Sequence, residues 1–217
     1  KFNESYMLKY RIKLFQFNPI QENTYVVYDE TRQAIVIDCG SLAEHEHRRF
    51  QQFVADNHLQ IKHVLNTHLH LDHAFGNYML AHTYGIAPEA HKDDEEFALR
   101  IVELAAFFGI EGDIRPQALG GYLQHGDVIR AGNMEAHVLH TPGHSPGGLC
   151  FYFPDEKVVF TGDTLFRDSI GRTDLRGGDY DALIESIRTQ LLTLPDDTAV
   201  YCGHGLPTTI GYERQNF

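Results

Sequence analysis

The stretch Thr-His-Leu-His-Leu-Asp-His, residues 67–73, places three imidazoles and one carboxylate directly after the apolar segment 61–65. Side chains alternate along an extended backbone, so His68 and His70 point to the same side, while Asp72 and His73 begin the next element. Neutral imidazoles combined with carboxylates suit zinc, and also iron or manganese. A solvated loop that happens to be rich in histidine would explain one such residue, but not the group.

Three later segments share one pattern, in which a short β-rich run is followed by a Gly or Pro turn and one His or Asp. They are Thr-Pro-Gly-His-Ser-Pro-Gly at 141–147, Phe-Thr-Gly-Asp-Thr-Leu-Phe at 160–166 and Tyr-Cys-Gly-His-Gly at 201–205. Loops at the ends of strands are where a rigid scaffold commonly presents functional residues. Adding His144, Asp163 and His204 gives five histidines and two aspartates. This set could hold two metal ions about 3.5–4 Å apart, with one carboxylate bridging them.

In this order, the motifs His-x-His-x-Asp-His, Pro-Gly-His, Gly-Asp-Thr and Gly-His-Gly resemble the metallo-β-lactamase fold superfamily. Segments 170–175 and 207–214 are similar to those of the small glyoxalase II-like (hydroxyacylglutathione hydrolase-like) enzymes. The resemblance implies an α/β fold, namely an αββα sandwich of two mixed sheets with outer helices, in a single domain over 1–217. The Asp at position 163 argues against an antibiotic-hydrolysing β-lactamase, because those sites generally lack it.

The resemblance also implies which residues hold metal: His68, His70 and His144 the first ion, Asp72, His73 and His204 the second, with Asp163 bridging. We expect two divalent ions, zinc before iron or manganese. Such ions lower the pKa of a shared water toward 7 and polarise an acyl oxygen, while Asp72 and Asp163 orient the nucleophile. A thioester suits this chemistry because a thiol with a pKa around 8.5 leaves readily. We therefore predict hydrolysis of thioesters of the S-lactoylglutathione type.

Arg172 lies in a Gly-rich loop just past Asp163, where related hydrolases have a substrate-binding lysine. We predict that it binds an anionic group of a small-molecule thioester. Two residues on, Asp174 stands where those enzymes have a tyrosine. Classical glyoxalase II enzymes also hold glutathione with a C-terminal helical extension, whereas this sequence ends at Phe217. We thus expect loose glutathione binding, or another thiol carrier.

Three alternatives remain open from the sequence. Persulfide dioxygenases are also similar to this chain and use one ferrous ion on the equivalents of His68, His144 and Asp163. A hydrolase of another small ester or a lactone would need the same metal centre. A non-enzymatic binding module on this fold would usually have lost ligands, and here the set is complete.

The charge and apolar content of the chain limit its partners. The formal net charge is −12 over 217 residues, which disfavours nucleic acid, since phosphate binding rewards clustered Lys and Arg. No apolar run reaches 18 residues and no secretory signal is visible, so we expect no membrane partner. The sequence leaves the oligomeric state open. Met7 is a candidate native start, with residues 1–6 an upstream remnant.

Three cysteines, Cys39, Cys150 and Cys202, are far apart and lie in or beside apolar β-like runs. We interpret them as buried free thiols, which are typical of a reducing, cytoplasmic compartment.

Hydrophobic periodicity predicts the remaining elements. Expected strands are 10–17, 24–28, 34–38, 61–66, 128–129, 136–139, 149–153, 157–160 and 199–201, and expected helices are 42–57, 74–84, 93–108 and 179–192. Ser41 is the predicted N-cap of the first helix, in a capping box with Glu44. We interpret Phe107, Phe108 and Phe166 as core residues, and expect the loop 109–121 to overhang the site.

Overall fold

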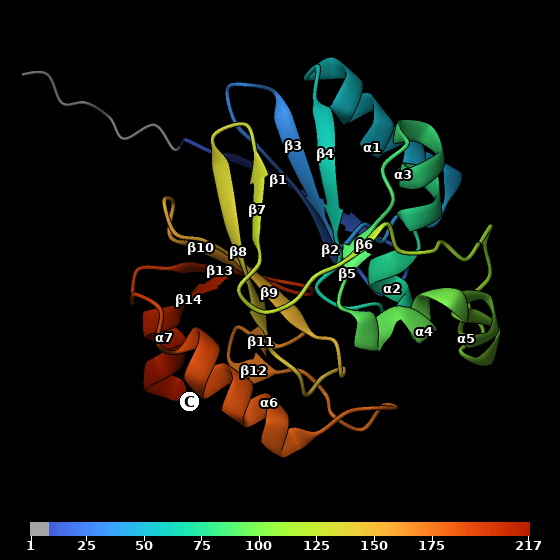
Figure 1. Cartoon of the computed structure of the whole chain (residues 1–217). Helices are drawn as coiled ribbons and strands as arrows, with labels where there is room; N and C mark the ends of the chain where they lie inside the picture. The colour runs from blue at the N-terminus through green and yellow to red at the C-terminus, as the bar shows by residue number, and fades with distance from the viewer. Residues whose placement is uncertain (1–8) are drawn as a thin grey trace, which may run out of the picture.

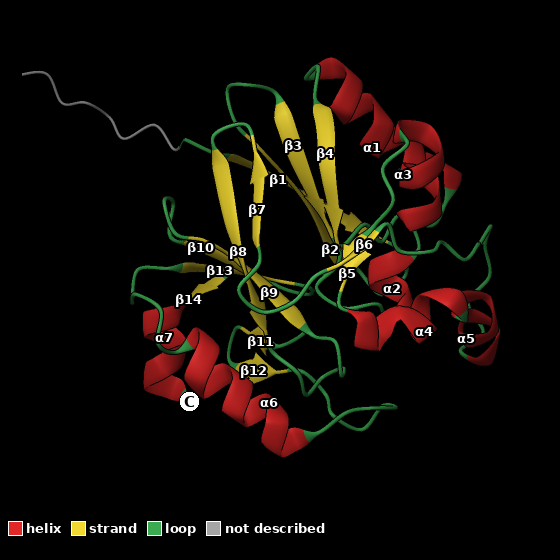
Figure 2. Cartoon of the chain, viewed as in Figure 1, coloured by secondary structure: helices red, strands yellow, loops and turns green. Residues whose placement is uncertain are grey.

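The computed structural model describes residues 9–217, so the expected start at Met7 lies outside the described residues. Two six-stranded mixed sheets pack face to face between layers of helices (Figures 1 and 2). This is the predicted αββα arrangement.

The first sheet has the strand order β1 to β6. Its strands are β1 (Arg11–Phe17), β2 (Glu22–Tyr28), β3 (Gln33–Ile37), β4 (Gln60–Leu65), β5 (Glu89–Ala90) and β6 (Gly121–Tyr122). The pairs β1–β2 and β2–β3 are antiparallel, and the pairs from β3 to β6 are parallel. Every residue of β2 is buried, because this strand is covered by the second sheet on one face and by helices on the other.

The second sheet has the order β14-β13-β10-β9-β8-β7. Its strands are β7 (Val128–Ala131), β8 (Met134–His140), β9 (Leu149–Phe153), β10 (Val158–Gly162), β13 (Ala199–Cys202) and β14 (Thr208–Thr209). Only β10 and β13 pair in parallel. Their carboxyl ends therefore meet at one edge of the sheet. A short hairpin of β11 (Leu165–Phe166) and β12 (Ser169–Ile170) follows β10.

Helices cover both outer faces. α1 (Glu44–Asp56) and α3 (Asn77–Tyr84) lie against the first sheet, and α6 (Tyr180–Ser186) and α7 (Ile210–Asn216) against the second (Figure 1). The remaining helices, α2 (Leu71–Ala74), α4 (Glu95–Leu99) and α5 (Ile101–Phe107), share a third apolar cluster beside the first sheet. No helix within residues 9–217 has the length and apolar character needed to cross a bilayer.

Three predicted helices differ from the structure. The segment 74–84 is divided at Gly76 into α2 and α3, and 93–108 is divided at Arg100, after a 3₁₀ turn at Lys92–Asp94. In the segment 179–192, Asp179 is the N-cap of α6, and the helix ends in a π-helical turn, Ile187–Leu191.

The predicted capping of the first helix is wrong. Ala43 is the N-cap, and the Glu46 carboxylate accepts hydrogen bonds from the backbone N–H groups of Leu42 and Ala43. Ser41 is buried instead, with its hydroxyl 2.9 Å from Nδ1 of His47. The three cysteines are buried and free, as predicted.

Candidate metal centre

Seven side chains predicted to bind metal come together from four separate places in the chain. His68 and His70 follow β4, Asp72 and His73 lie in α2, and His144 lies in the turn between β8 and β9; Asp163 directly follows β10 and His204 follows β13. The parallel pairing of β10 with β13 places Asp163 and His204 at the same sheet edge.

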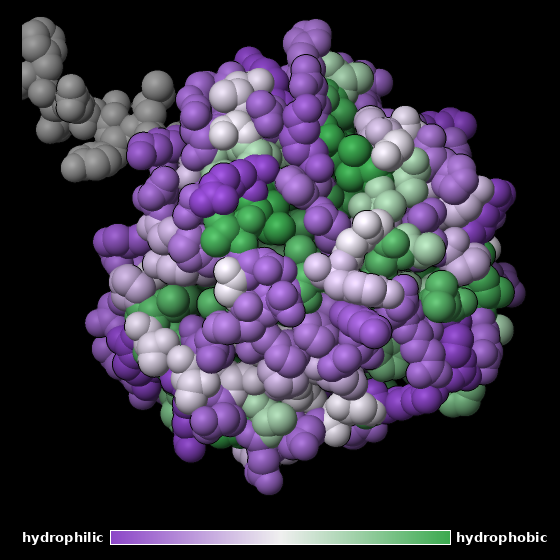
Figure 3. All heavy atoms as spheres, in the orientation of Figure 1, coloured by the Kyte–Doolittle hydropathy of each residue, from purple (hydrophilic) through white to green (hydrophobic). Residues whose placement is uncertain are grey.

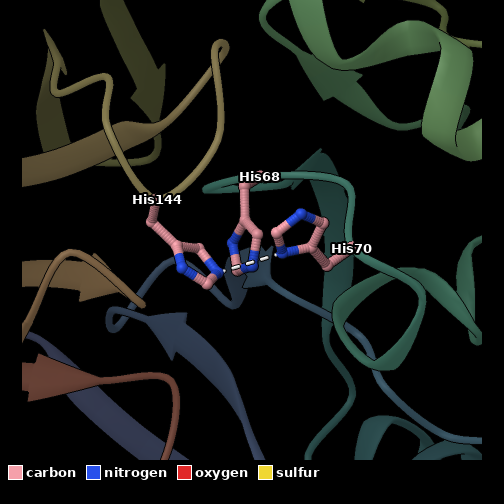
Figure 4. Close-up of side chains that lie close together, drawn as sticks. All are labelled: His68, His70 and His144. Carbon is pink, nitrogen blue, oxygen red and sulfur yellow. Dashed lines mark hydrogen bonds between the residues drawn. The ribbon is translucent and has the colours of Figure 1, made fainter. Parts of the chain in front are cut away.

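The first donor group is formed by His68, His70 and His144, whose rings converge in Figure 4. One ring nitrogen from each lies within 4.8 Å of the others. Nδ1 of His70 is 2.9 Å from Nε2 of His144. Nδ1 of His144 lies 2.8 Å from the carbonyl oxygen of Arg172. A hydrogen bond donated there fixes the ring and leaves Nε2 facing the centre.

The second donor group is formed by Asp72, His73 and His204. Oδ2 of Asp72 lies 3.4 Å from Nε2 of His73 and 3.1 Å from Nε2 of His204. The His204 segment is held from the other sheet: the Tyr25 hydroxyl donates to the Cys202 carbonyl over 2.7 Å, and Asn23 Nδ2 donates to the same oxygen over 3.0 Å.

Asp163 lies between the two groups. Its Oδ2 is 3.5 Å from Nε2 of His144 in the first group and 3.5 Å from Nε2 of His204 in the second. Its Oδ1 is 3.3 Å from Nε2 of His73. Gly203 makes this close approach possible, because a Cβ there would lie 2.2 Å from Oδ1 of Asp163.

Burial and mutual charge set the protonation of these groups. Burial lowers the pKa of His68 well below its ordinary value, and burial together with His144 lowers the pKa of His70 to about 4. Burial alone would raise the pKa of Asp163, but attraction from His73 outweighs it and the pKa falls well below its usual range. His68, His70 and Asp163 are therefore in the forms that bind metal. Burial would lower the pKa of His73 and His204, but the neighbouring Asp163 and Asp72 outweigh it and raise both, so a metal ion in the second group would displace protons there.

Two buried donor atoms without hydrogen-bond partners among the described residues also indicate that the site suits divalent ions. Within residues 9–217, Nε2 of His68 and Oδ1 of Asp163 are buried and have no hydrogen-bond partner. Buried polar atoms are normally satisfied, so these two atoms lack a partner that a positive ion between the groups would provide. Imidazole and carboxylate donors suit zinc, iron or manganese alike.

Asp38, which the sequence did not single out, orients one of the imidazoles. Its Oδ2 is 3.0 Å from Nδ1 of His73, and its carboxylate also accepts from the backbone N–H of Thr67 over 2.7 Å and from the Thr67 hydroxyl. Nε2 of His73 is thereby turned toward the centre. A carboxylate behind a ligating histidine is a common feature of metal sites.

Asp94 is a second such residue, and it joins the two loops of the first donor group. Its carboxylate accepts from the Ser145 hydroxyl over 2.7 Å, from the backbone N–H of Gly147 over 2.6 Å and from that of Leu69 over 3.3 Å. Ser145 and Gly147 follow His144 on one loop, and Leu69 lies between His68 and His70 on the other. A buried acid at the start of a predicted helix gave no sequence signal for this role.

We expect Asp94→Asn to weaken metal binding about 10- to 100-fold, because the amide cannot accept all of these hydrogen bonds and the loops would shift. Titration of metal-free protein against a chromogenic chelator measures this. The matched control is Asp93→Asn, whose side chain is 59% exposed. An affinity within twofold of the parent would show that Asp94 does not position the ligands.

A cavity of about 570 Å³ opens on the centre. His70, Asp72, His144, Asp163 and His204 contribute to its lining, together with Arg172 and Arg176. Arg172 thus lies where a substrate could reach it, but its guanidinium donates through Nε and Nη2 to Asp174, over 2.6 and 2.8 Å.

The predicted core positions of two aromatics are wrong. Phe107 is 82% exposed and Phe108 is 52% exposed, and Phe108 lines the cavity. Phe166 is half-buried, 6.3 Å from the His204 ring. The loop after α5 does reach the site, since Ile110 also lines the cavity.

Comparison with known proteins agrees with the resemblance to the metallo-β-lactamase superfamily. The sequence pattern of the Metallo-beta-lactamase superfamily matches residues 17–204. The chain is 35% identical over 206 residues to hydroxyacylglutathione hydrolase GloC of Haemophilus influenzae, covering 94% of this chain and 95% of that protein.

Two solved structures share the fold. One is the BLEG-1 B3 metallo-beta-lactamase, with a TM-score of 0.85 and 33% identity over 94% of this chain and 97% of that one. The other is TTHA1623 in a di-iron-bound form, with a TM-score of 0.82 and 34% identity over 94% of this chain and 98% of that one. By fold, ordered motifs and sequence, this chain belongs to the metallo-β-lactamase superfamily.

Proposed function

We propose that this chain, a metal-dependent hydrolase of the metallo-β-lactamase superfamily, cleaves thioesters of the S-lactoylglutathione type. The observation that carries the proposal is the pair of donor groups with Asp163 between them, at the base of a cavity large enough for a small molecule. Its similarity to a hydroxyacylglutathione hydrolase supports the choice of thioester.

His68, His70 and His144 would hold one ion, Asp72, His73 and His204 the other, and Asp163 would touch both. Two divalent ions at these positions would activate water near neutral pH and polarise the acyl oxygen. Asp38 and the Arg172 carbonyl keep two of the imidazoles in fixed orientations. Asp72 and Asp163 both line the cavity and would orient the water that the ions activate.

The overall reaction adds water to the acyl carbon and breaks the carbon–sulfur bond. The products are a carboxylate and a thiol, with one proton released to solvent. A thiolate leaves without prior protonation at neutral pH far more readily than an amine. This matters because the cavity lining contains carboxylates and metal-binding imidazoles, but no Lys or Tyr that could serve as a dedicated acid.

The test is an assay of zinc-loaded protein with S-D-lactoylglutathione, following the free thiol released. A chromogenic cephalosporin serves as a parallel substrate, in view of the similarity to a B3 metallo-beta-lactamase. Hydrolysis of the thioester at least about a hundredfold faster than that of the cephalosporin is the expected result. Turnover of the cephalosporin alone would refute the proposal.

We further propose that Arg172 contacts an anionic group of the substrate at the cavity rim. The contact requires Arg172 to share its guanidinium with Asp174 or to leave it. Arg172→Ala is expected to raise KM for a glutathione thioester roughly tenfold, with a smaller change in kcat, because charge-assisted contacts act mainly on binding.

The effect of Arg172→Ala should weaken with added salt and be absent for a short, uncharged thioester. Arg188→Ala is the matched control, since that arginine lies on the π-helical turn and does not line the cavity. Equal losses on charged and uncharged substrates would mean that Arg172 supports the loop through Asp174 instead.

A further inference from the structure

Half of the residues that line the cavity are apolar, and the metal centre does not explain them. Seven apolar side chains form this apolar wall: Ile20, Leu71, Phe97, Leu104, Phe108, Ile110 and Leu175. Four of them come from α4, α5 and the residues just after α5, and the Phe97 ring lies 5.1 Å from that of His70. The wall therefore begins at the first donor group and extends outward.

This wall is partly open to solvent. Phe108 is 52% exposed and Ile20 is 47% exposed. Leu99 and Val102 are also half-exposed on α4 and α5 but do not line the cavity. Figure 3 shows hydrophobic atoms at this side of the molecule. Apolar side chains beside a cavity indicate a site that takes an apolar group.

The cationic side chains of the cavity are already compensated. Arg172 is paired with Asp174, and both terminal nitrogens of Arg176 are paired with Glu96, Nη1 over 3.0 Å and Nη2 over 3.2 Å. An incoming anion must compete with these carboxylates. An apolar group that binds at the wall displaces no such ion pair. We therefore expect apolar contact to contribute more to substrate binding than ionic contact with Arg172 or Arg176.

We propose that the preferred substrates are thioesters whose acyl group is apolar, an aliphatic chain or an aryl group, and that this group lies against the α4–α5 wall. The proposal rests on the thioester hydrolase function proposed above and specifies its substrate class. The reacting carbonyl must lie at the donor groups, and the wall starts there at Phe97, so the acyl chain reaches it directly. The thiol carrier then extends toward the rim at Arg172 and Arg176.

The test compares glutathione thioesters that differ only in the acyl group: acetyl, butanoyl, hexanoyl and D-lactoyl. With zinc-loaded protein, kcat/KM is expected to rise about fourfold for each added CH₂ group, the value for full burial of a methylene. Butanoyl should exceed D-lactoyl at least about tenfold. Repeating the acetyl and hexanoyl measurements on the uncharged carrier N-acetylcysteamine should give the same hexanoyl-to-acetyl ratio.

Two variants test the location of the acyl group. Leu104→Ala and the half-exposed Phe108→Ala should each lower the hexanoyl-to-acetyl ratio at least about fivefold. The matched control, Val102→Ala, changes a half-exposed residue on the same helix that does not line the cavity, and should leave both rates unchanged. Because Phe108 is 52% exposed, Phe108→Ala removes less buried area than a substitution in the core.

Failure of this inference is distinguishable from failure of the proposed function. If all four thioesters are hydrolysed but kcat/KM does not depend on chain length, or is highest for D-lactoyl, the apolar acyl site is wrong. The proposed thioester hydrolase function would be unaffected by that result. The apolar acyl site would also be overturned if the preference for hexanoyl disappeared with N-acetylcysteamine as the carrier. The same holds if both Leu104→Ala and Phe108→Ala kept that preference. No hydrolysis of any thioester would refute the function itself.

Discussion

Asp163→Ala is expected to lower kcat/KM for a thioester at least about a hundredfold, which corresponds to about 2.7 kcal/mol of transition-state stabilisation. The reason is the position of Asp163, with Oδ2 at 3.5 Å from one histidine of each donor group. Its loss removes the carboxylate that lies between the two groups, and leaves Asp72 as the carboxylate beside His73 and His204. Thiol release and metal content should be measured on the same preparation.

The control for this change is Asp181→Ala, an exposed aspartate in the first turn of α6. It should retain parental activity and metal content. If Asp163→Ala stays within about threefold of the parent with metal occupancy unchanged, a mechanism that uses two ions is wrong.

Removal of metal is expected to have the largest effect, abolishing activity to the background of the assay. Chelation would take away the ions that we propose activate water, and the residues described as lining the cavity include no base other than the predicted ligands. Elemental analysis should find two ions per chain, and adding zinc back to the metal-free protein should restore hydrolysis. The apparent melting temperature should also fall, because an ion that binds only the folded state stabilises it.

The same measurement separates hydrolysis from oxygenation. A single iron per chain, with oxygen consumed in the presence of glutathione persulfide, would identify a persulfide dioxygenase instead. The likeness to a protein crystallised in a di-iron-bound form makes iron content worth measuring in every preparation.

Much of the centre is predictable from the sequence because each donor is local to a motif. His68 and His70 lie in the short segment that joins β4 to α2, and Asp72 and His73 lie in the single turn of α2, so all four are close together in sequence. His144, Asp163 and His204 each follow a strand and a glycine, and such positions face the loop side of a sheet. The distances that join them, such as 2.9 Å between His70 and His144, depend on how the sheets pack, which no motif contains.

The helix boundaries show where tertiary contacts override local preference. The acids at 93–96 favour the start of one long helix, but the buried Asp94 carboxylate accepts hydrogen bonds from Ser145 and Gly147, 51 and 53 residues away in sequence. Instead of one long helix, the segment forms a 3₁₀ turn at Lys92–Asp94 and two short helices that are separated at Arg100. Similarly, Glu46 caps α1 in place of Glu44, and it also accepts from the backbone N–H of Asn18 on another loop.

Hydrophobicity alone could not place Phe108. An apolar residue next to a helix end has the same sequence pattern whether it packs in the core or lines a substrate cavity. Only the folded arrangement of α4, α5 and the metal centre separates the two.

The attachment of the His204 segment to β2 has a consequence for the order of assembly. The contact between Asn23 in β2 and Cys202 in β13 spans 179 residues. During synthesis on the ribosome, β2 is therefore made long before β13. His68, His70, Asp72, His73 and even His144 are therefore available while the second donor group is still incomplete. If the chain holds two ions, as we propose, the second donor group is complete only once β13 has docked against β2, so binding of the second ion would come late in folding.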